Sequence, residues 1–143
     1  MPYNSYNLQS TRLTYDEILQ AGHINQDLAR YELRRVWVVD ARVRDGVRHL
    51  YPRRTFYIDE DSWQILAVDI YDNRGQLWRF QEAHSVNFFN AQAVTGILES
   101  TYDLQSGRYI AVGLGNEDPV SDYRWTASPS YFTPAQLRRG GRR

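Results

Sequence analysis

Apolar and polar residues alternate along the middle of the chain, which is the pattern of a β-strand with one buried face. Asp45-Gly46 lies between two of these segments and is typical of a hairpin turn. The expected strands cover residues 31–44, 48–58, 63–71, 76–88, 94–102 and 108–114. We therefore predict a mainly β protein whose strands form an antiparallel meander.

The third and fourth expected strands are joined by Asp72-Asn73-Arg74-Gly75, which is typical of a type I turn with glycine in a left-handed bulge position. The register that follows from this turn pairs Val68 with Phe80, Asp69 with Arg79 and Ile70 with Trp78. In this register both faces of the sheet carry large apolar side chains. We therefore predict a strongly curved sheet with something packed inside it.

Short helices are expected on either side of the meander. A capping-box pattern at residues 14–17, followed by Ile18 and Leu19, predicts a helix of about two turns. Thr133-Pro134 predicts the start of a second short helix. We expect a polar lead-in at residues 1–30, the meander at 31–114, and a loop with a terminal helix at 115–143, forming a single domain or the C-terminal part of a larger one.

Composition excludes several classes of protein. The 143 residues include no cysteine, which excludes a disulfide framework and a thiolate zinc site. The three histidines have no metal-ligand spacing, so neither a metal nor another cofactor is expected. The 17 basic and 17 acidic residues cancel, which gives no overall attraction to nucleic acid or to an anionic membrane. No apolar run reaches the roughly 20 residues that span a bilayer.

Catalytic motifs are also missing from the sequence. There is no Gly-x-Ser-x-Gly elbow, and Gly113-Leu114-Gly115 lacks the third glycine of a nucleotide loop. Glu82 and His84 share one face of the fourth expected strand and could form an acid–base pair for hydrolysis. The favoured interpretation of these two residues is a polar end of an otherwise apolar strand. We therefore expect a protein that is not an enzyme.

Large apolar side chains of the expected strands are candidates for lining a ligand cavity, because apolar pockets are walled by such groups. These candidates are Trp37, Phe56, Trp63, Leu66, Val68, Ile70, Trp78 and Phe80. Ordinary core packing accounts for the same residues equally well. Arg35 and Arg54 are candidates for binding a carboxylate or phosphate head group, whereas Asp69 and Arg79 are expected to pair with each other. For the arginines, pairing with a neighbouring acidic residue is the alternative.

Several stretches resemble the C-terminal portion of domain-of-unknown-function family 1329. They are residues 31–39, 54–65, 71–79 and 102–109 and the ending Phe132-Thr133-Pro134. Within them, Tyr-Ile-Asp-x-x-x-Trp at residues 57–63 and Tyr-Asp-x-x-Gly at 71–75 are similar to the pattern of lipoprotein carriers. The family is related to outer-membrane lipoprotein-sorting proteins of the LolA and LolB type.

The resemblance implies a curved antiparallel sheet that forms an incomplete LolA/LolB-like barrel, whose concave side, plugged by helices, accepts acyl chains. It implies a periplasmic, non-enzymatic binding or carrier module for lipids or lipoprotein acyl chains, linked to the outer membrane. The alternative is a protein–protein docking module of an envelope transport complex that acts through exposed sheet edges. Family members are typically longer, so we expect the missing N-terminal portion, or a homo-oligomer, to complete the sheet.

Overall fold

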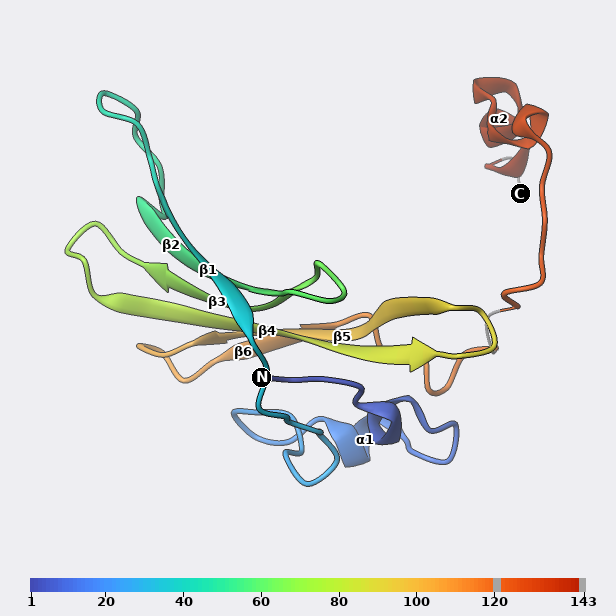
Figure 1. Cartoon of the computed structure of the whole chain (residues 1–143), viewed down its shortest axis with the longest axis horizontal. Helices are drawn as coiled ribbons and strands as arrows, with labels where there is room; N and C mark the ends of the chain where they lie inside the picture. The colour runs from blue at the N-terminus through green and yellow to red at the C-terminus, as the bar shows by residue number, and fades with distance from the viewer. Residues whose placement is uncertain (120–121, 142–143) are drawn as a thin grey trace.

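The computed structural model describes residues 1–119 and 122–141 and contains one six-stranded antiparallel sheet. The strands follow one another in sequence order, and within the described residues the sheet does not close (Figure 1). The strands are β1 (Val36–Arg42), β2 (Arg53–Asp59), β3 (Ile65–Tyr71), β4 (Leu77–Phe88), β5 (Ala93–Asp103) and β6 (Tyr109–Val112). The predicted mainly β meander is confirmed.

Four short helical elements flank the sheet: η1 (Tyr6–Gln9), α1 (Tyr15–Ile18), η2 (Pro129–Phe132) and α2 (Pro134–Gly140). The capping box is present, because the Glu17 carboxylate accepts the Thr14 backbone N–H at 2.8 Å. The helix is nevertheless only one turn long, since the chain reverses through an antiparallel bridge between Leu19 and Ile24. The second predicted helix begins where expected, and the Thr133 hydroxyl accepts the backbone N–H of Gln136 at 3.4 Å.

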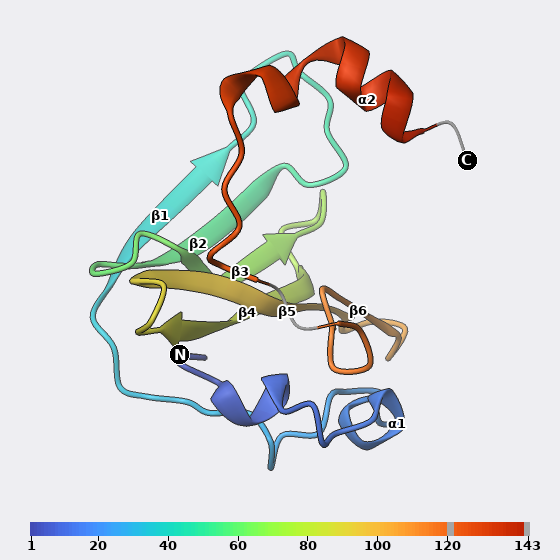
Figure 2. The ribbon, with the colours of Figure 1, turned by 90° about the vertical axis from the view of Figure 1, so that its right-hand side faces the viewer.

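The N-terminal segment, residues 1–31, forms a second layer beneath β4, β5 and β6 (Figures 1 and 2). Three of its aliphatic side chains are buried against those strands, because the period-two alternation turns one apolar row of the sheet towards them. The core consists of Leu8, Ile18 and Ile24 from the segment and Val86, Ile97 and Leu98 from β4 and β5. Asn116, which follows β6, also holds the segment in place, because its Nδ2 donates a hydrogen bond of 2.7 Å to the Leu8 carbonyl.

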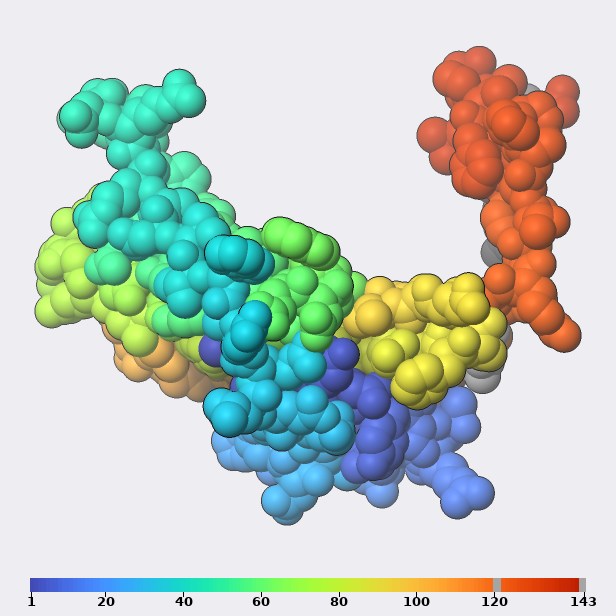
Figure 3. All heavy atoms as spheres, in the orientation of Figure 1, coloured from blue at the N-terminus to red at the C-terminus, as the bar shows by residue number. Residues whose placement is uncertain are grey.

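The sheet bends away from the N-terminal segment, so its opposite face is concave (Figures 1 and 3). No element of the described chain covers that face. The C-terminal arm, residues 124–141 with η2 and α2, extends away from the sheet beyond the concave side (Figure 1). The arginine-rich end of the sequence includes residues 142–143, which lie outside the described part of the chain.

The predicted register of β3 and β4 is wrong beyond its turn. The turn itself forms, with the Asp72 N–H donating to the Gln76 carbonyl at 3.0 Å. Tyr71 then pairs with Leu77, but Ile70 pairs with Arg79, so Trp78 is the extra residue of a β-bulge. A shift of one residue exchanges the two faces of a strand. The actual pairs are Val68 with Gln81 and Asp69 with Phe80.

The predicted Asp69–Arg79 pair does not form, because the bulge places the two residues on opposite faces. Asp69 accepts a hydrogen bond from the Tyr57 hydroxyl at 2.8 Å instead. Arg79 Nε lies 3.3 Å from Asp103 Oδ2. The face of β1 to β3 that was predicted to be apolar around this pair is largely polar, with Asp40, Arg53, Thr55, Tyr57 and Asp69.

The curvature of the sheet is confirmed, but its cause differs from the predicted one. Register shifts occur in three of the pairings, at Tyr57/Ile58, Ile70/Tyr71 and His84/Ser85. Each bulge bends its strand and increases the local twist. The bend is therefore explained by three β-bulges, and it does not need the two apolar faces on which the prediction of curvature was based.

Candidate ligand-binding face

The concave face is formed by the side chains that point away from the N-terminal segment. Each strand contributes alternate residues to it, as the pairing register dictates. Its members are Trp37 and Val39 of β1, Arg54, Phe56 and Ile58 of β2, Leu66, Val68 and Ile70 of β3, Arg79 and Gln81 of β4, Glu99 and Thr101 of β5, and Ile110 and Val112 of β6. The face is apolar from β1 to β3 and more polar on β4 and β5.

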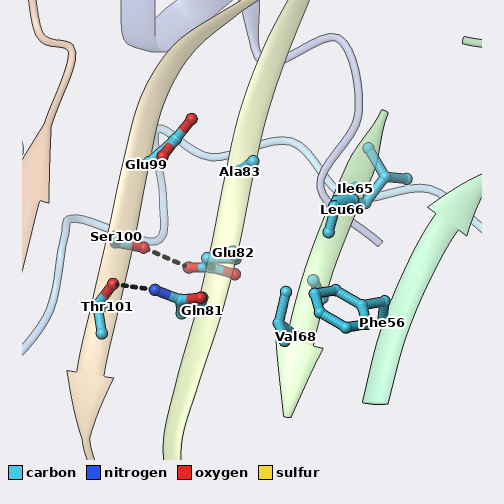
Figure 4. A pocket seen from close by; sticks show the side chains of 11 residues that line it. Phe56, Ile65, Leu66, Val68, Gln81, Glu82, Ala83, Glu99, Ser100 and Thr101 are labelled. Carbon is cyan, nitrogen blue, oxygen red and sulfur yellow. Dashed lines mark hydrogen bonds between the residues drawn. The ribbon is translucent and has the colours of Figure 1, made fainter. Parts of the chain in front are cut away.

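A shallow depression of about 220 Å³ lies at the centre of this face (Figure 4). Phe56, Leu66 and Val68 form its apolar wall. Gln81 and Thr101, joined by a hydrogen bond of 2.9 Å, lie on its polar side. The depression is smaller than the roughly 300–1,000 Å³ of typical ligand pockets. A long ligand would therefore lie along the face rather than inside a closed cavity.

Two tryptophans extend the apolar surface beyond the depression. The rings of Trp37 and Trp63 are nearly parallel, with centroids 6.5 Å apart and 14° between their planes. They are 55% and 69% exposed, which is unusual for so large an apolar side chain. Both residues were predicted to line a ligand, and the structure brings them together at the end of the sheet where the β2–β3 turn lies.

The backbone that presents Trp63 adopts a conformation that L side chains rarely occupy, with φ at +59°. A buried carboxylate imposes it. Asp59 accepts hydrogen bonds from the Ser62 backbone and hydroxyl, both at 2.8 Å, and from Arg34 Nε and Nη2 at 3.0 and 2.8 Å. Burial raises the pKa of Asp59, but these donors outweigh it and hold the pKa below its usual range. The structure thus over-determines a strained turn that carries an exposed tryptophan.

At the other end of β2 and β3, the concave face carries two arginines. Arg54 and Arg79 flank Ile70 in register, and the Tyr51 ring lies near both guanidinium groups, 5.2 and 5.6 Å from its centroid. Arg79 is paired with Asp103, whose pKa falls to about 2 because the backbone N–H of Ser106 bonds to it. Arg54 has no acidic partner among the described residues. It is therefore the concave-face arginine that remains available for an anion.

The remaining predicted residues lie elsewhere. Arg35 forms an exposed ion pair with Glu60 at 3.0 Å, so it follows the alternative of pairing with an acidic residue and not that of binding a head group. Trp78, at the bulge, donates from Nε1 to Asp103 at 2.9 Å. Because the register is shifted, Phe80 lies on the other face of the sheet from Val68. There its ring stacks on Tyr102. No sequence pattern pointed to Arg34 or Tyr51, although Asp59-x-x-Ser62 is a recognisable turn pattern.

Glu82 and His84 lie on the face covered by the N-terminal segment, together with Ser5. The Ser5 hydroxyl is 3.1 Å from His84 Nδ1, and His84 Nε2 is 3.5 Å from Glu82 Oε1. The order resembles a catalytic triad, but all three side chains are buried, and the Ser5 hydroxyl also bonds to the backbone of Arg30. This burial favours a polar lock between segment and sheet. Glu82 and His84 were predicted to form a polar end of the strand, and the structure instead buries both of them beneath the N-terminal segment.

The Glu82 carboxylate is the centre of this lock. It accepts hydrogen bonds from the hydroxyls of Tyr31 and Tyr102, both at 3.1 Å. Burial raises the pKa of Glu82, but His84 and the two tyrosine donors outweigh it, so the pKa lies below its usual range. Burial and the same carboxylate raise the pKa of Tyr102 to about 12. The lock is therefore built around a charged Glu82 at neutral pH.

Residues 1–119 and 122–141 contain no cluster of three or more side chains able to hold a metal ion. In the same part of the chain, no helix is long and apolar enough to cross a membrane.

Sequence comparison identifies a family. The family model described as "Protein of unknown function (DUF1329)" matches residues 1–138. The uncharacterized protein PA3922 of Pseudomonas aeruginosa is 51% identical over 142 residues. That alignment covers 99% of this chain but only 31% of PA3922, so the chain spans about a third of its relative. The resemblance predicted from the sequence is confirmed.

Two solved structures are similar to this chain at low identity. A DUF1329 family protein from Desulfovibrio piger matches 71% of this chain and 40% of its own, with a TM-score of 0.45 and 16% identity. A proposed outer membrane lipoprotein-sorting protein domain from Vibrio parahaemolyticus matches 73% of this chain and 48% of its own, with a TM-score of 0.44 and 13% identity.

The polar lock predicts an acid-sensitive contribution to stability. Because the pKa of Glu82 is lower in the folded protein, its contribution is complete above the unfolded value of about 4.3 and is lost as the pH falls through the folded pKa. Glu82→Gln should lower the free energy of unfolding by about 1–3 kcal/mol at pH 7. The difference from wild type should shrink below about pH 4, as measured by urea denaturation at a series of pH values. A difference that stays constant with pH would contradict the charged lock. The control is Glu99→Gln, at an exposed position, which should lower the free energy of unfolding by less than about 0.5 kcal/mol.

The strained turn predicts an unusual order of stability at Trp63. A residue with a Cβ pays about 1–2 kcal/mol to adopt the left-handed conformation, and glycine avoids this cost. Glycine also destabilises the folded state by about 0.5–1 kcal/mol, because it gives the unfolded chain more conformational entropy. Trp63→Gly should therefore be more stable than Trp63→Ala by about 0.5–1 kcal/mol in thermal denaturation. At Trp37, which lies in β1, the order should reverse and alanine should be the more stable replacement. The same order at both positions would exclude strain at Trp63.

Proposed function

The chain belongs to the DUF1329 family, whose function is unknown, and we propose that its concave face binds an acyl chain of a lipid or lipoprotein and carries out no reaction. The supporting observation is an apolar face that no described element covers. The exposed apolar area of this face lies mainly on Val39 and the Trp37–Trp63 pair, because Leu66 and Val68 are only 1% and 6% exposed at the floor of the depression. Removing such surface from water is worth about 25 cal/mol per Å², so an acyl chain is a favourable occupant.

A polar group on the ligand would meet Arg54. Its guanidinium lies on the concave face beside Ile70, at the end of the sheet opposite the tryptophan pair. Guanidinium groups bind carboxylates and phosphates through paired hydrogen bonds. The proposed orientation therefore places the head group at Arg54 and the acyl chain along Phe56 towards Trp37.

The proposed setting is the periplasm, where the module would carry lipids or lipoprotein acyl chains in connection with the outer membrane. Support for this setting comes from the sequence resemblance described above. The rest of a protein as long as PA3922 would supply further surface, because this chain corresponds to 31% of that relative. A covering layer contributed by such a region would turn the open face into an enclosed site.

A second candidate function is docking on a partner protein of an envelope transport complex. The observation that favours it is the edge strand β1, which pairs with no other strand of the described chain on its outer side and exposes Trp37, Val38 and Val39. An exposed apolar edge strand is a template for adding a strand from another chain. The two candidates differ in the part of the sheet that they use, the concave face or the β1 edge.

Titration with a fluorescent fatty acid such as cis-parinaric acid tests the first candidate. Saturable binding to the wild-type chain is expected. Trp37→Ala should weaken it about tenfold, because an apolar contact of the acyl chain is lost. Trp125→Ala is the matched control, since Trp125 has a similar exposure of 57% but lies on the C-terminal arm, and it should bind as wild type does. No saturable binding, together with self-association that Val38→Lys abolishes, would favour docking at β1 instead.

The head-group assignment is tested with a pair of ligands. Arg54→Gln should weaken binding of the fatty acid about tenfold, because a charge-assisted hydrogen bond is lost. Binding of the fatty alcohol of the same chain length should change less than about twofold, since that ligand carries no anion. Equal losses for both ligands would show that Arg54 contributes to packing and not to recognition of the charge.

A further inference from the structure

The hairpin tip, residues 43–52 between β1 and β2, projects from the sheet beyond the ends of both strands (Figures 1 and 3). Its base is closed by a hydrogen bond of 2.9 Å from the Val43 N–H to the Pro52 carbonyl. Its turn is closed by a bond of 3.1 Å from the Val47 N–H to the Arg44 carbonyl, with Gly46 at φ +79°. The tip is therefore an ordered structure that stands clear of the core.

Positive charge is concentrated around the β1–β2 hairpin although the whole chain is neutral. Residues 40–54 contain five arginines and two aspartates, which gives a local charge of +3 with His49 neutral, and of these the tip holds Arg44, Arg48 and Asp45. Asp40 is shared by Arg42 and Arg53. Arg44 and Arg48 have no acidic partner among the described residues. Their guanidinium groups are exposed and available to an anionic surface.

The same tip exposes aliphatic side chains. Val47 and Leu50 are 60% and 56% exposed. Arginines beside exposed aliphatic residues suit the interface of an anionic bilayer, because the aliphatic groups enter the acyl boundary while guanidinium groups bind phosphate oxygens. A nucleic acid would use the charge alone and would leave Val47 and Leu50 in water. The combination therefore favours a lipid surface.

The tip is continuous with the concave face. A second depression of about 190 Å³ runs along the inner side of the hairpin, with Val43, Pro52 and Phe56 in its wall. Phe56 also lines the central depression of the concave face. The two depressions thus adjoin at Phe56, so the tip is next to the face that we assign to the acyl chain.

We propose that the hairpin tip docks this protein on an anionic phospholipid surface, with Val47 and Leu50 entering the interface and Arg44 and Arg48 binding lipid phosphates. The use of this docking for lipid transfer rests on the proposed function of the concave face. The docking itself does not, because none of these four side chains belongs to that face.

Co-sedimentation of the full chain with vesicles tests the proposal. The chain should bind vesicles of phosphatidylglycerol mixed with phosphatidylcholine, bind pure phosphatidylcholine vesicles much less, and lose binding as salt is added. Each arginine near the surface contributes about fivefold to partitioning, so the double variant Arg44→Gln/Arg48→Gln should bind about 25-fold less. Val47→Ser/Leu50→Ser should also weaken binding, because the aliphatic anchor is removed.

The matched control is Arg12→Gln/Arg124→Gln, which removes two exposed arginines from the N-terminal segment and the C-terminal arm and should bind vesicles as wild type does. Equal binding to neutral and anionic vesicles, no vesicle binding, or an equal loss in the control would overturn the proposal. Retention on a nucleic acid without vesicle binding would also overturn it. Circular dichroism and thermal denaturation establish that each variant is folded.

The fatty acid titration separates this proposal from the proposed function. The tip variants should keep wild-type affinity for cis-parinaric acid in the absence of vesicles, whereas Trp37→Ala should keep wild-type binding to vesicles. Vesicle binding without fatty acid binding would leave docking in place and remove the carrier function. Fatty acid binding without vesicle binding would keep the ligand-binding function of the concave face and overturn the docking of the hairpin tip.

Discussion

The packing of the N-terminal segment against β4 and β5 is the interaction on which the rest of the structure depends. Leu8, Ile18 and Ile24 bury there against Val86 and Leu98, and the charged Glu82 is buried with them because two tyrosines and His84 compensate it. This layer occupies one face of the sheet and leaves the other free. The position of the candidate ligand-binding face therefore follows from where the core lies.

The alternation of apolar and polar residues was sufficient to predict six strands, their order and the capping box, because each of these is decided within a few residues. The bulges could not be predicted in the same way. Trp78 fits a regular strand as well as a bulge, and the bulge depends on long-range contacts, the hydrogen bond of Trp78 to Asp103 on β5 and the pairing of Arg79 with Ile70 on β3. The face of Phe80 and the partner of Asp69 were wrong for this reason. No register between β2 and β3 was predicted, and the structure brings Phe56 and Val68 together by pairing them directly.

Local features decide the surface chemistry of this protein more than its averages do. A formal charge of zero gave no reason to expect contact with an anionic surface, yet the β1–β2 hairpin concentrates arginines at one end of the molecule. The strained backbone at Trp63 is similar, since a buried ion pair between Arg34 and Asp59 maintains an exposed aromatic residue. Such arrangements reduce stability and are kept where a surface has a use.

The location of the N-terminal segment also has a consequence for the order of events during synthesis. Every strand pairing joins neighbours in the sequence, so the hairpins can form one after another as the chain leaves the ribosome. The segment is made before the strands, but its partners are His84, Leu98 and Asn116, up to 108 residues later. Its aliphatic side chains stay in water until β5 has been translated. The segment can therefore pack only after all its partner strands have formed, and the two-layer structure becomes complete only once Asn116 has been translated.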